Sequence, residues 1–119
     1  LYSGHIHYEL KEFDESIKSY EGFLKKASSE NPLRIFAFDG LGYGYEAKGD
    51  YEDALVYFRK LIDATENPLS KPAYFNLSRC YEQLGEKDKA IETYQNVLTN
   101  YPNSSYASLA KEKINILKR

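Results

Sequence analysis

The chain has 119 residues, of which 42% are hydrophobic and 29% charged, and this composition excludes an intrinsically disordered or collagen-like segment. The 16 Lys and Arg residues are balanced by 18 Asp and Glu, and the net charge of −2 gives no broad positive field for nucleic acid. No apolar run approaches the about 20 residues that a bilayer-spanning helix needs, so we predict no direct membrane contact by this segment.

The spacing of small and aromatic residues divides the chain into similar units. Ser16, Ala54 and Ala90 are each followed by an aromatic side chain four residues later and preceded by a ring nine residues earlier. The separations, 38 and 36 residues, give a period near 36, which is typical of helical repeats. We therefore expect a truncated first unit over residues 1–30, a second unit over 31–66, a third over 67–102, and a terminal segment over 103–119.

Each complete unit has the periodicity of a pair of helices. In the second unit Phe38, Leu41 and Tyr45 fall on one helical face, and the third unit repeats this face one period later. Gly49 and Gly85 then interrupt the two patterns, so that a second helix follows in each unit. Strand signals are absent. The sequence predicts an all-α chain of seven helices, counting a pair in the truncated first unit and one terminal helix.

This pattern resembles the tetratricopeptide repeat, whose signature is W-x2-L-G-x2-Y, then A-x3-F, then P. The second and third units match through Phe38-x2-Leu41-Gly42-x2-Tyr45, Ala54-x3-Phe58 and Pro68, and through Tyr74-x2-Leu77-Ser78-x2-Tyr81, Ala90-x3-Tyr94 and Pro102. Aromatic rings replace the signature Trp, and Ser78 replaces the glycine. The resemblance implies a short right-handed α–α solenoid of helix pairs with a C-terminal capping helix.

A second resemblance concerns the end of the chain. The segment from Tyr101 to Lys111 is similar to the close of bacterial cell-envelope repeat proteins, namely the periplasmic coordinator of the Tol–Pal machinery and ancillary subunits of the Sec translocon. The sequence also begins in what reads as the middle of an element, so we expect it to belong to a longer protein. Together these points imply a location in the bacterial periplasm, within an anchored or exported protein.

Residues with catalytic or metal-binding chemistry give no pattern that predicts an enzyme. His5 and His7 are two residues apart and point in different directions on a helix, so they do not form a metal-binding pair. The glycines of Gly40-x-Gly42-x-Gly44 lie inside a helical face, where close packing explains them better than a phosphate-binding loop. Cys80 has no His within helical reach. We predict no catalytic residue, no metal site and no cofactor.

The faces of the first helices that the core does not need form the candidate binding surface. In the family that this chain resembles, first helices line a concave groove that binds peptides or partner helices. The corresponding residues are His5, Tyr8, Glu9, Phe36, Asp39, Tyr43, Glu46, Phe75, Arg79, Glu82 and Gln83. Two alternatives stay open for the aromatic members: packing against adjoining helices and self-association.

The expected function is therefore non-catalytic protein–protein interaction, with a partner segment that carries apolar anchors and some Lys or Arg. The groove positions that clamp chaperone carboxylate tails in related repeats hold His5, Gly40, Pro72 and Asn76, so that clamp is absent. The basic residues of the terminal helix complement its dipole and lack the aromatic neighbours of a nucleic-acid surface. The alternative function is a structural spacer or self-association segment of a larger membrane-anchored envelope protein, and a homo-oligomer is the corresponding alternative partner.

Overall fold

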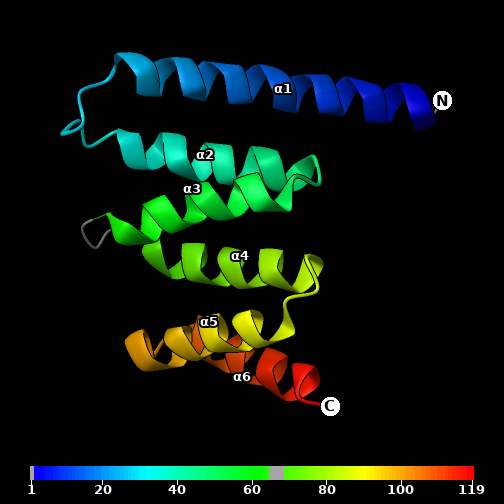
Figure 1. Ribbon diagram of the computed structural model, residues 1–119, viewed down its shortest axis with the longest axis vertical. Coiled ribbons are helices and arrows are strands. Elements are labelled where there is room, and N and C mark those ends of the chain that lie inside the picture. Colours follow the sequence, from blue (N-terminus) through cyan, green and yellow to red (C-terminus); the bar gives the residue numbers. More distant parts are fainter. Residues whose placement is uncertain (1, 65–68) are drawn as a thin grey trace.

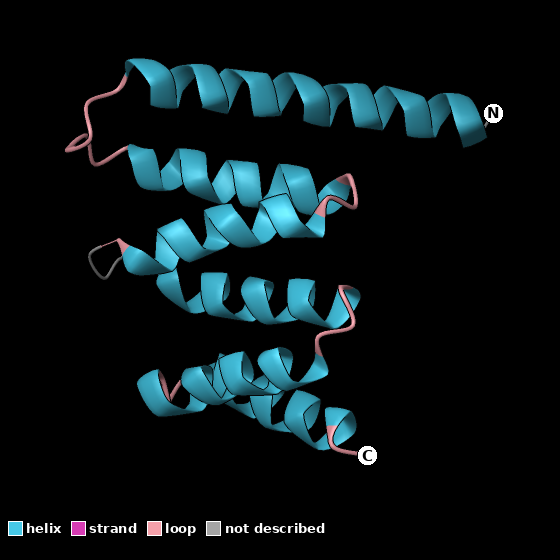
Figure 2. Cartoon of the chain, viewed as in Figure 1, coloured by secondary structure: helices cyan, strands magenta, loops and turns pink. Residues whose placement is uncertain are grey.

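The structure is a computed structural model that describes residues 2–64 and 69–119, with side chains described from residue 11 onward. Within these residues all regular structure is helical, as Figure 2 shows, and the all-α prediction is confirmed. The helices are α1 (Tyr2–Lys26), α2 (Arg34–Ala47), α3 (Tyr51–Asp63), α4 (Ser70–Gln83), α5 (Lys87–Asn100) and α6 (Ser105–Leu117).

The helices stack in chain order to form a solenoid. Figure 1 shows α1 at one end of the stack and α6 at the other, and each helix packs against the next one in the sequence. Helix α4 also contacts α6, although α5 separates the two in the chain. Because short turns join α2 to α3 and α4 to α5, these helices form two antiparallel pairs, and α6 packs on the last pair as a terminal helix.

The described residues contain six helices, so the prediction of seven is wrong, and the difference lies in the first unit. Gly49 and Gly85 close the first helices of the other units with positive φ angles of 82° and 75°, a conformation that residues with a Cβ rarely adopt. Lys11 occupies the equivalent position of the first unit, five residues before Ser16. With no glycine to end it, the helix continues, and residues 2–26 form the single helix α1.

The small residues of the repeat lie where helices cross. Ala54 and Ala90 are fully buried in the core cluster, together with the rings of Phe58 and Tyr94. A Cβ added to Gly42 would come within 2.5 Å of the Phe58 ring, so this glycine lets α2 and α3 approach closely. The prediction that these positions must be small is confirmed.

The other two glycines of the Gly40-x-Gly42-x-Gly44 run lie against the preceding helix, α1. The ring of Tyr20 on α1 lies against Gly40, and the side chain of Ile17 lies 3.0 Å from where a Cβ on Gly44 would stand. Helix α1 therefore crosses α2 over these two glycines. The interpretation of the glycine run as a packing surface is confirmed.

Candidate functional site

The candidate groove residues of the second and third units follow one side of α2 and one side of α4, and we call this surface the first-helix face. It comprises Phe36, Asp39, Tyr43 and Glu46 on α2, and Phe75, Arg79, Glu82 and Gln83 on α4. The spacing of three and four residues keeps each set on one side of its helix. The side chains of the remaining predicted residues, His5, Tyr8 and Glu9, lie outside the part of the chain whose side chains the structure describes.

A network of polar side chains joins the α2 and α4 parts of the first-helix face. Asn76 donates through Nδ2 to the hydroxyl of Tyr43 at 2.8 Å. Arg79 donates through Nε and Nη2 to the two carboxylate oxygens of Glu46, at 2.5 and 2.8 Å, and through Nη2 to Oδ1 of Asn76 at 2.9 Å. The bond to Glu46 raises the pKa of Arg79, whose guanidinium stays protonated. The network fixes Tyr43 and Arg79 in place.

The α4 part of the face is tied to α5 and α6. Phe75 is half-buried, and its ring packs against those of Tyr94 and Tyr106 at centroid distances of 5.2 and 5.8 Å. Glu82 accepts a hydrogen bond from the Tyr94 hydroxyl at 2.8 Å and lies 4.0 Å from Nζ of Lys113. Burial and the Glu82 carboxylate raise the pKa of Tyr94, which stays protonated as a donor. Phe75 thus packs against adjoining helices, which is one of the two alternatives that sequence analysis left open.

The two aromatic residues of α2 differ from Phe75 because much of their surface faces solvent. Phe36 is 55% exposed and Tyr43 is 44% exposed. Asp39 lies between them in the sequence and is partly buried, and this burial raises the pKa of its carboxyl group. On α4, Gln83 is exposed. The α2 part of the face therefore offers exposed aromatic surface beside a carboxylate.

Sequence analysis missed the contribution of α6 to this face. Leu109 and Ile116 are 47% and 56% exposed, and they lie four residues before and three residues after Lys113. Because Lys113 approaches Glu82, the same side of α6 is next to the first-helix face, and we add Leu109, Lys113 and Ile116 to it. The i, i+4, i+7 spacing of these residues was visible in the sequence, but the prediction of a C-terminal capping helix did not use it.

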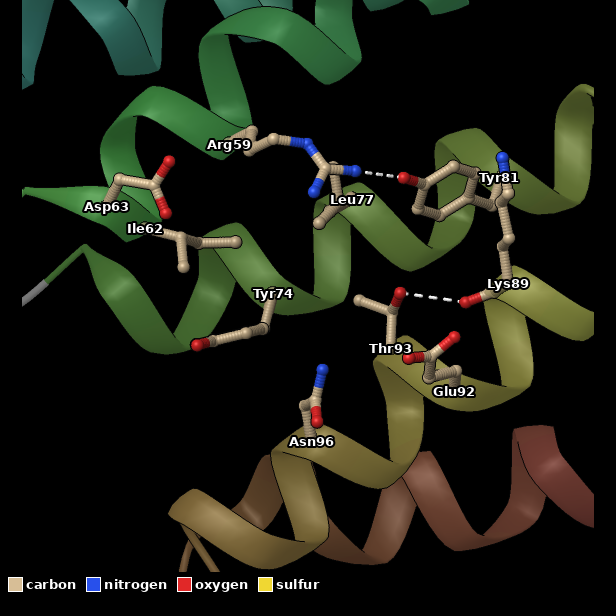
Figure 3. A pocket seen from close by; sticks show the side chains of 10 residues that line it. All are labelled: Arg59, Ile62, Asp63, Tyr74, Leu77, Tyr81, Lys89, Glu92, Thr93 and Asn96. Atoms are coloured by element: carbon tan, nitrogen blue, oxygen red, sulfur yellow. Dashed lines mark hydrogen bonds between the residues drawn. The ribbon is translucent and has the colours of Figure 1, made fainter.

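A hollow of about 420 Å³ lies on a different side of α4 from the first-helix face, between α3 and α5. Figure 3 shows the guanidinium of Arg59 on α3 reaching the hydroxyl of Tyr81, to which it donates a hydrogen bond. Thr93 donates to the main-chain oxygen of Lys89 at 2.8 Å, and the Lys89 ammonium lies 5.9 Å from the Tyr81 ring centre. The charged residues that line this hollow are balanced, with Arg59 and Lys89 opposed by Asp63 and Glu92. This cleft has no excess charge and no exposed aromatic pair comparable to that on α2.

The described residues contain no group of three or more His, Cys, Asp or Glu side chains that could hold a metal ion. Cys80 is fully buried, and burial raises the pKa of its thiol to about 12. A thiol in this environment stays protonated and is a poor nucleophile. None of the helices in the described part of the chain has both the length and the hydropathy needed to cross a membrane.

These features define a helical-repeat protein whose first helices are joined by a network of polar side chains. Residues 45–114, more than half of the chain, match the sequence profile of the tetratricopeptide repeat. The chain belongs to the tetratricopeptide repeat family, and membership of this family indicates a protein-interaction or scaffold role.

Relatives with curated descriptions come from distant organisms. The chain is 33% identical over 95 residues to the RNA polymerase-associated protein CTR9 of Saccharomyces cerevisiae, a match over 75% of this chain and 8% of that protein. It is 31% identical over 93 residues to the Photosystem I assembly protein Ycf3 of Prochlorococcus marinus, over 77% of this chain and 53% of Ycf3. It is 26% identical over 97 residues to the Intraflagellar transport protein 88 homolog of Homo sapiens, over 81% of this chain and 11% of the relative.

The chain thus spans about half the length of one of these relatives and about a tenth of the other two. These relatives do not support the narrower resemblance to bacterial cell-envelope repeat proteins.

Proposed function

We propose that this chain is a non-catalytic interaction module that binds a peptide or a partner helix along the first-helix face. The proposal keeps the expected division into a truncated unit (1–30), two complete units (31–66 and 67–102) and a capping helix (103–119). It keeps the predicted face residues of α2 and α4 and adds those of α6. The partner is a protein, and the proposal includes no nucleic acid, cofactor or metal ion.

The observation that carries this proposal is the exposure of large apolar side chains on a face whose framework is rigid. Phe36 and Tyr43 on α2 and Leu109 and Ile116 on α6 are each more than 40% exposed. Between them, the Glu46–Arg79 pair and the Phe75 ring cluster hold the helices in register. Because the anchors are fixed before binding, little conformational entropy is lost on association. Large apolar side chains that stay exposed on one face of a folded domain are candidates for contact with a partner.

The names of the relatives are consistent with this proposal. One relative is named as an assembly protein, one as RNA polymerase-associated and one as a transport protein. We therefore propose that the partner belongs to a multi-protein assembly.

The experiment is affinity capture from source-cell extract with quantitative mass spectrometry, using wild-type chain and a Phe36→Ala/Leu109→Ala variant as baits. Phe75 is left intact because its ring packs against Tyr94 and Tyr106. Val56→Ala is the matched control, since Val56 is an exposed apolar residue of α3. Circular dichroism first establishes that each bait is folded.

A protein held by the wild type and the Val56→Ala chain but lost by the double variant supports the proposal. A protein held equally by all three baits would show that the binding surface lies outside the first-helix face. Capture of nothing, combined with association of the chain in light scattering, would favour self-association, and capture of nothing by a monomer would favour a structural spacer.

A further inference from the structure

Asp39 is the one carboxylate of the first-helix face that has no counter-charge among the described residues. Glu46 is paired with Arg79, and Glu82 accepts from Tyr94 and lies near Lys113. Asp39 makes no ion pair and no side-chain hydrogen bond within the described part of the chain. The negative charge of this face is therefore concentrated at one position of α2.

The register of the side-chain contacts between α2 and α4 is consistent with the lack of a partner for Asp39. Tyr43 meets Asn76 and Glu46 meets Arg79, and both pairs are separated by 33 residues. In this register the residue of α4 that corresponds to Asp39 is Pro72, whose side chain offers neither a charge nor a hydrogen-bond donor. Partial burial without a cation raises the pKa of the Asp39 carboxyl, so ionised Asp39 is less stable here than in water.

The two exposed rings of α2 flank this carboxylate. Phe36 lies three residues before Asp39 and Tyr43 lies four residues after it, so all three side chains share one side of the helix. The Tyr43 ring is held edge-on against Phe58 at 5.5 Å, and its hydroxyl is held by Asn76. A cation beside aromatic rings gains a cation–π attraction, and guanidinium also stacks on rings while it pairs with a carboxylate.

We propose that the first-helix face receives an Arg or Lys side chain of the partner segment between Phe36 and Tyr43, with its cationic head on the carboxylate of Asp39. The charge complementarity is specific to this position, because the other carboxylates of the face already have partners. The proposal rests on the proposed function, and it adds that the bound segment carries a basic residue next to its apolar anchors.

The test uses a random library of twelve-residue peptides displayed on phage and selected on the wild-type chain. Each enriched peptide is synthesised twice, once as selected and once with its Arg replaced by the neutral analogue citrulline, or its Lys by norleucine. Affinities for wild type, Asp39→Asn and Asp53→Asn are measured by fluorescence anisotropy. Asp53→Asn is the matched control, because it removes the same charge from an exposed position on α3.

We expect peptides with a basic residue beside apolar residues, and an affinity about tenfold or more lower for Asp39→Asn than for Asp53→Asn. Replacement of the basic residue by its neutral analogue should lower the affinity of the peptide for wild type by a similar factor. It should change the affinity for Asp39→Asn little. Enriched peptides that bind Asp39→Asn as tightly as wild type but lose affinity for Phe36→Ala would overturn the cation site while leaving the proposed function intact. A library that yields no peptide for the first-helix face would overturn both.

Discussion

Replacement of Gly42 by alanine tests the close crossing of α2 and α3, on which the position of the first-helix face depends. The added Cβ would stand 2.5–2.7 Å from three carbons of the Phe58 ring, which is fully buried in the core. Overpacking of a core costs about 1–3 kcal/mol, and we expect the upper part of this range, because three ring carbons conflict at once. Replacement of glycine by alanine inside a helix returns about 1 kcal/mol. The net loss in unfolding free energy should be about 2 kcal/mol, or roughly 8 °C in melting temperature for a domain of this size.

The matched control is Gly22→Ala in α1, where an added Cβ meets no atom within 4 Å. This variant has the same gain in helix propensity without the steric conflict, so its unfolding free energy should rise by about 0.5–1 kcal/mol. Urea and thermal denaturation followed by circular dichroism at 222 nm measure both effects. A Gly42→Ala chain as stable as the Gly22→Ala chain would refute the close crossing.

Three further predictions concern charged and titratable groups. Because burial raises the pKa of Cys80 to about 12, its reaction with Ellman's reagent at pH 8 should be at least about 100-fold slower in the folded than in the urea-unfolded chain, and equal rates would contradict this burial. The contribution of the protonated thiol to stability should be lost as pH rises from about 8.5 towards 12. A double-mutant cycle of Arg79→Gln and Glu46→Gln should give a coupling of about 0.5–1 kcal/mol that weakens in 1 M NaCl, whereas zero coupling would argue against a formed ion pair. Because the folded-state pKa of Asp39 is raised, stability should fall as pH rises from the ordinary carboxyl pKa of about 3.9 through the folded-state value. The Asp39→Asn variant should therefore have a higher melting temperature than wild type at pH 7, and a lower one would show that Asp39 stabilises the fold.

The sequence predicted the helix pairs well because their signals are local. Gly49 and Gly85 mark turns that only a residue without a Cβ adopts easily, and Gly42 and Ala54 mark crossings where side-chain volume is limiting. The single helix α1 obeys the same rule, although it was not predicted, because Lys11 stands where the other units have a turn glycine. The comparison of that one position would have given the correct number of helices.

The arrangement of the first-helix face was less predictable because it depends on the register between helices of different units. The meeting of Tyr43 with Asn76 is set by how α4 lies against α2, and no local pattern encodes this separation of 33 residues. The burial of Phe75 depends in the same way on Tyr94 and Tyr106, which come from the two following helices. An aromatic residue on a predicted exposed stripe can therefore be largely exposed to solvent, like Phe36, or packed against other rings, like Phe75.

The most direct test of the central claim is a map of where a bound partner touches the chain. Backbone amide shifts of the ¹⁵N-labelled protein would be recorded by NMR as the captured partner segment, or a peptide selected from the library, is added. We predict that the largest changes fall on α2 and α6 around Phe36, Tyr43 and Leu109, and that they disappear in the Phe36→Ala/Leu109→Ala variant. Changes centred instead on the cleft between α3 and α5, around Arg59 and Lys89, would contradict binding at the first-helix face.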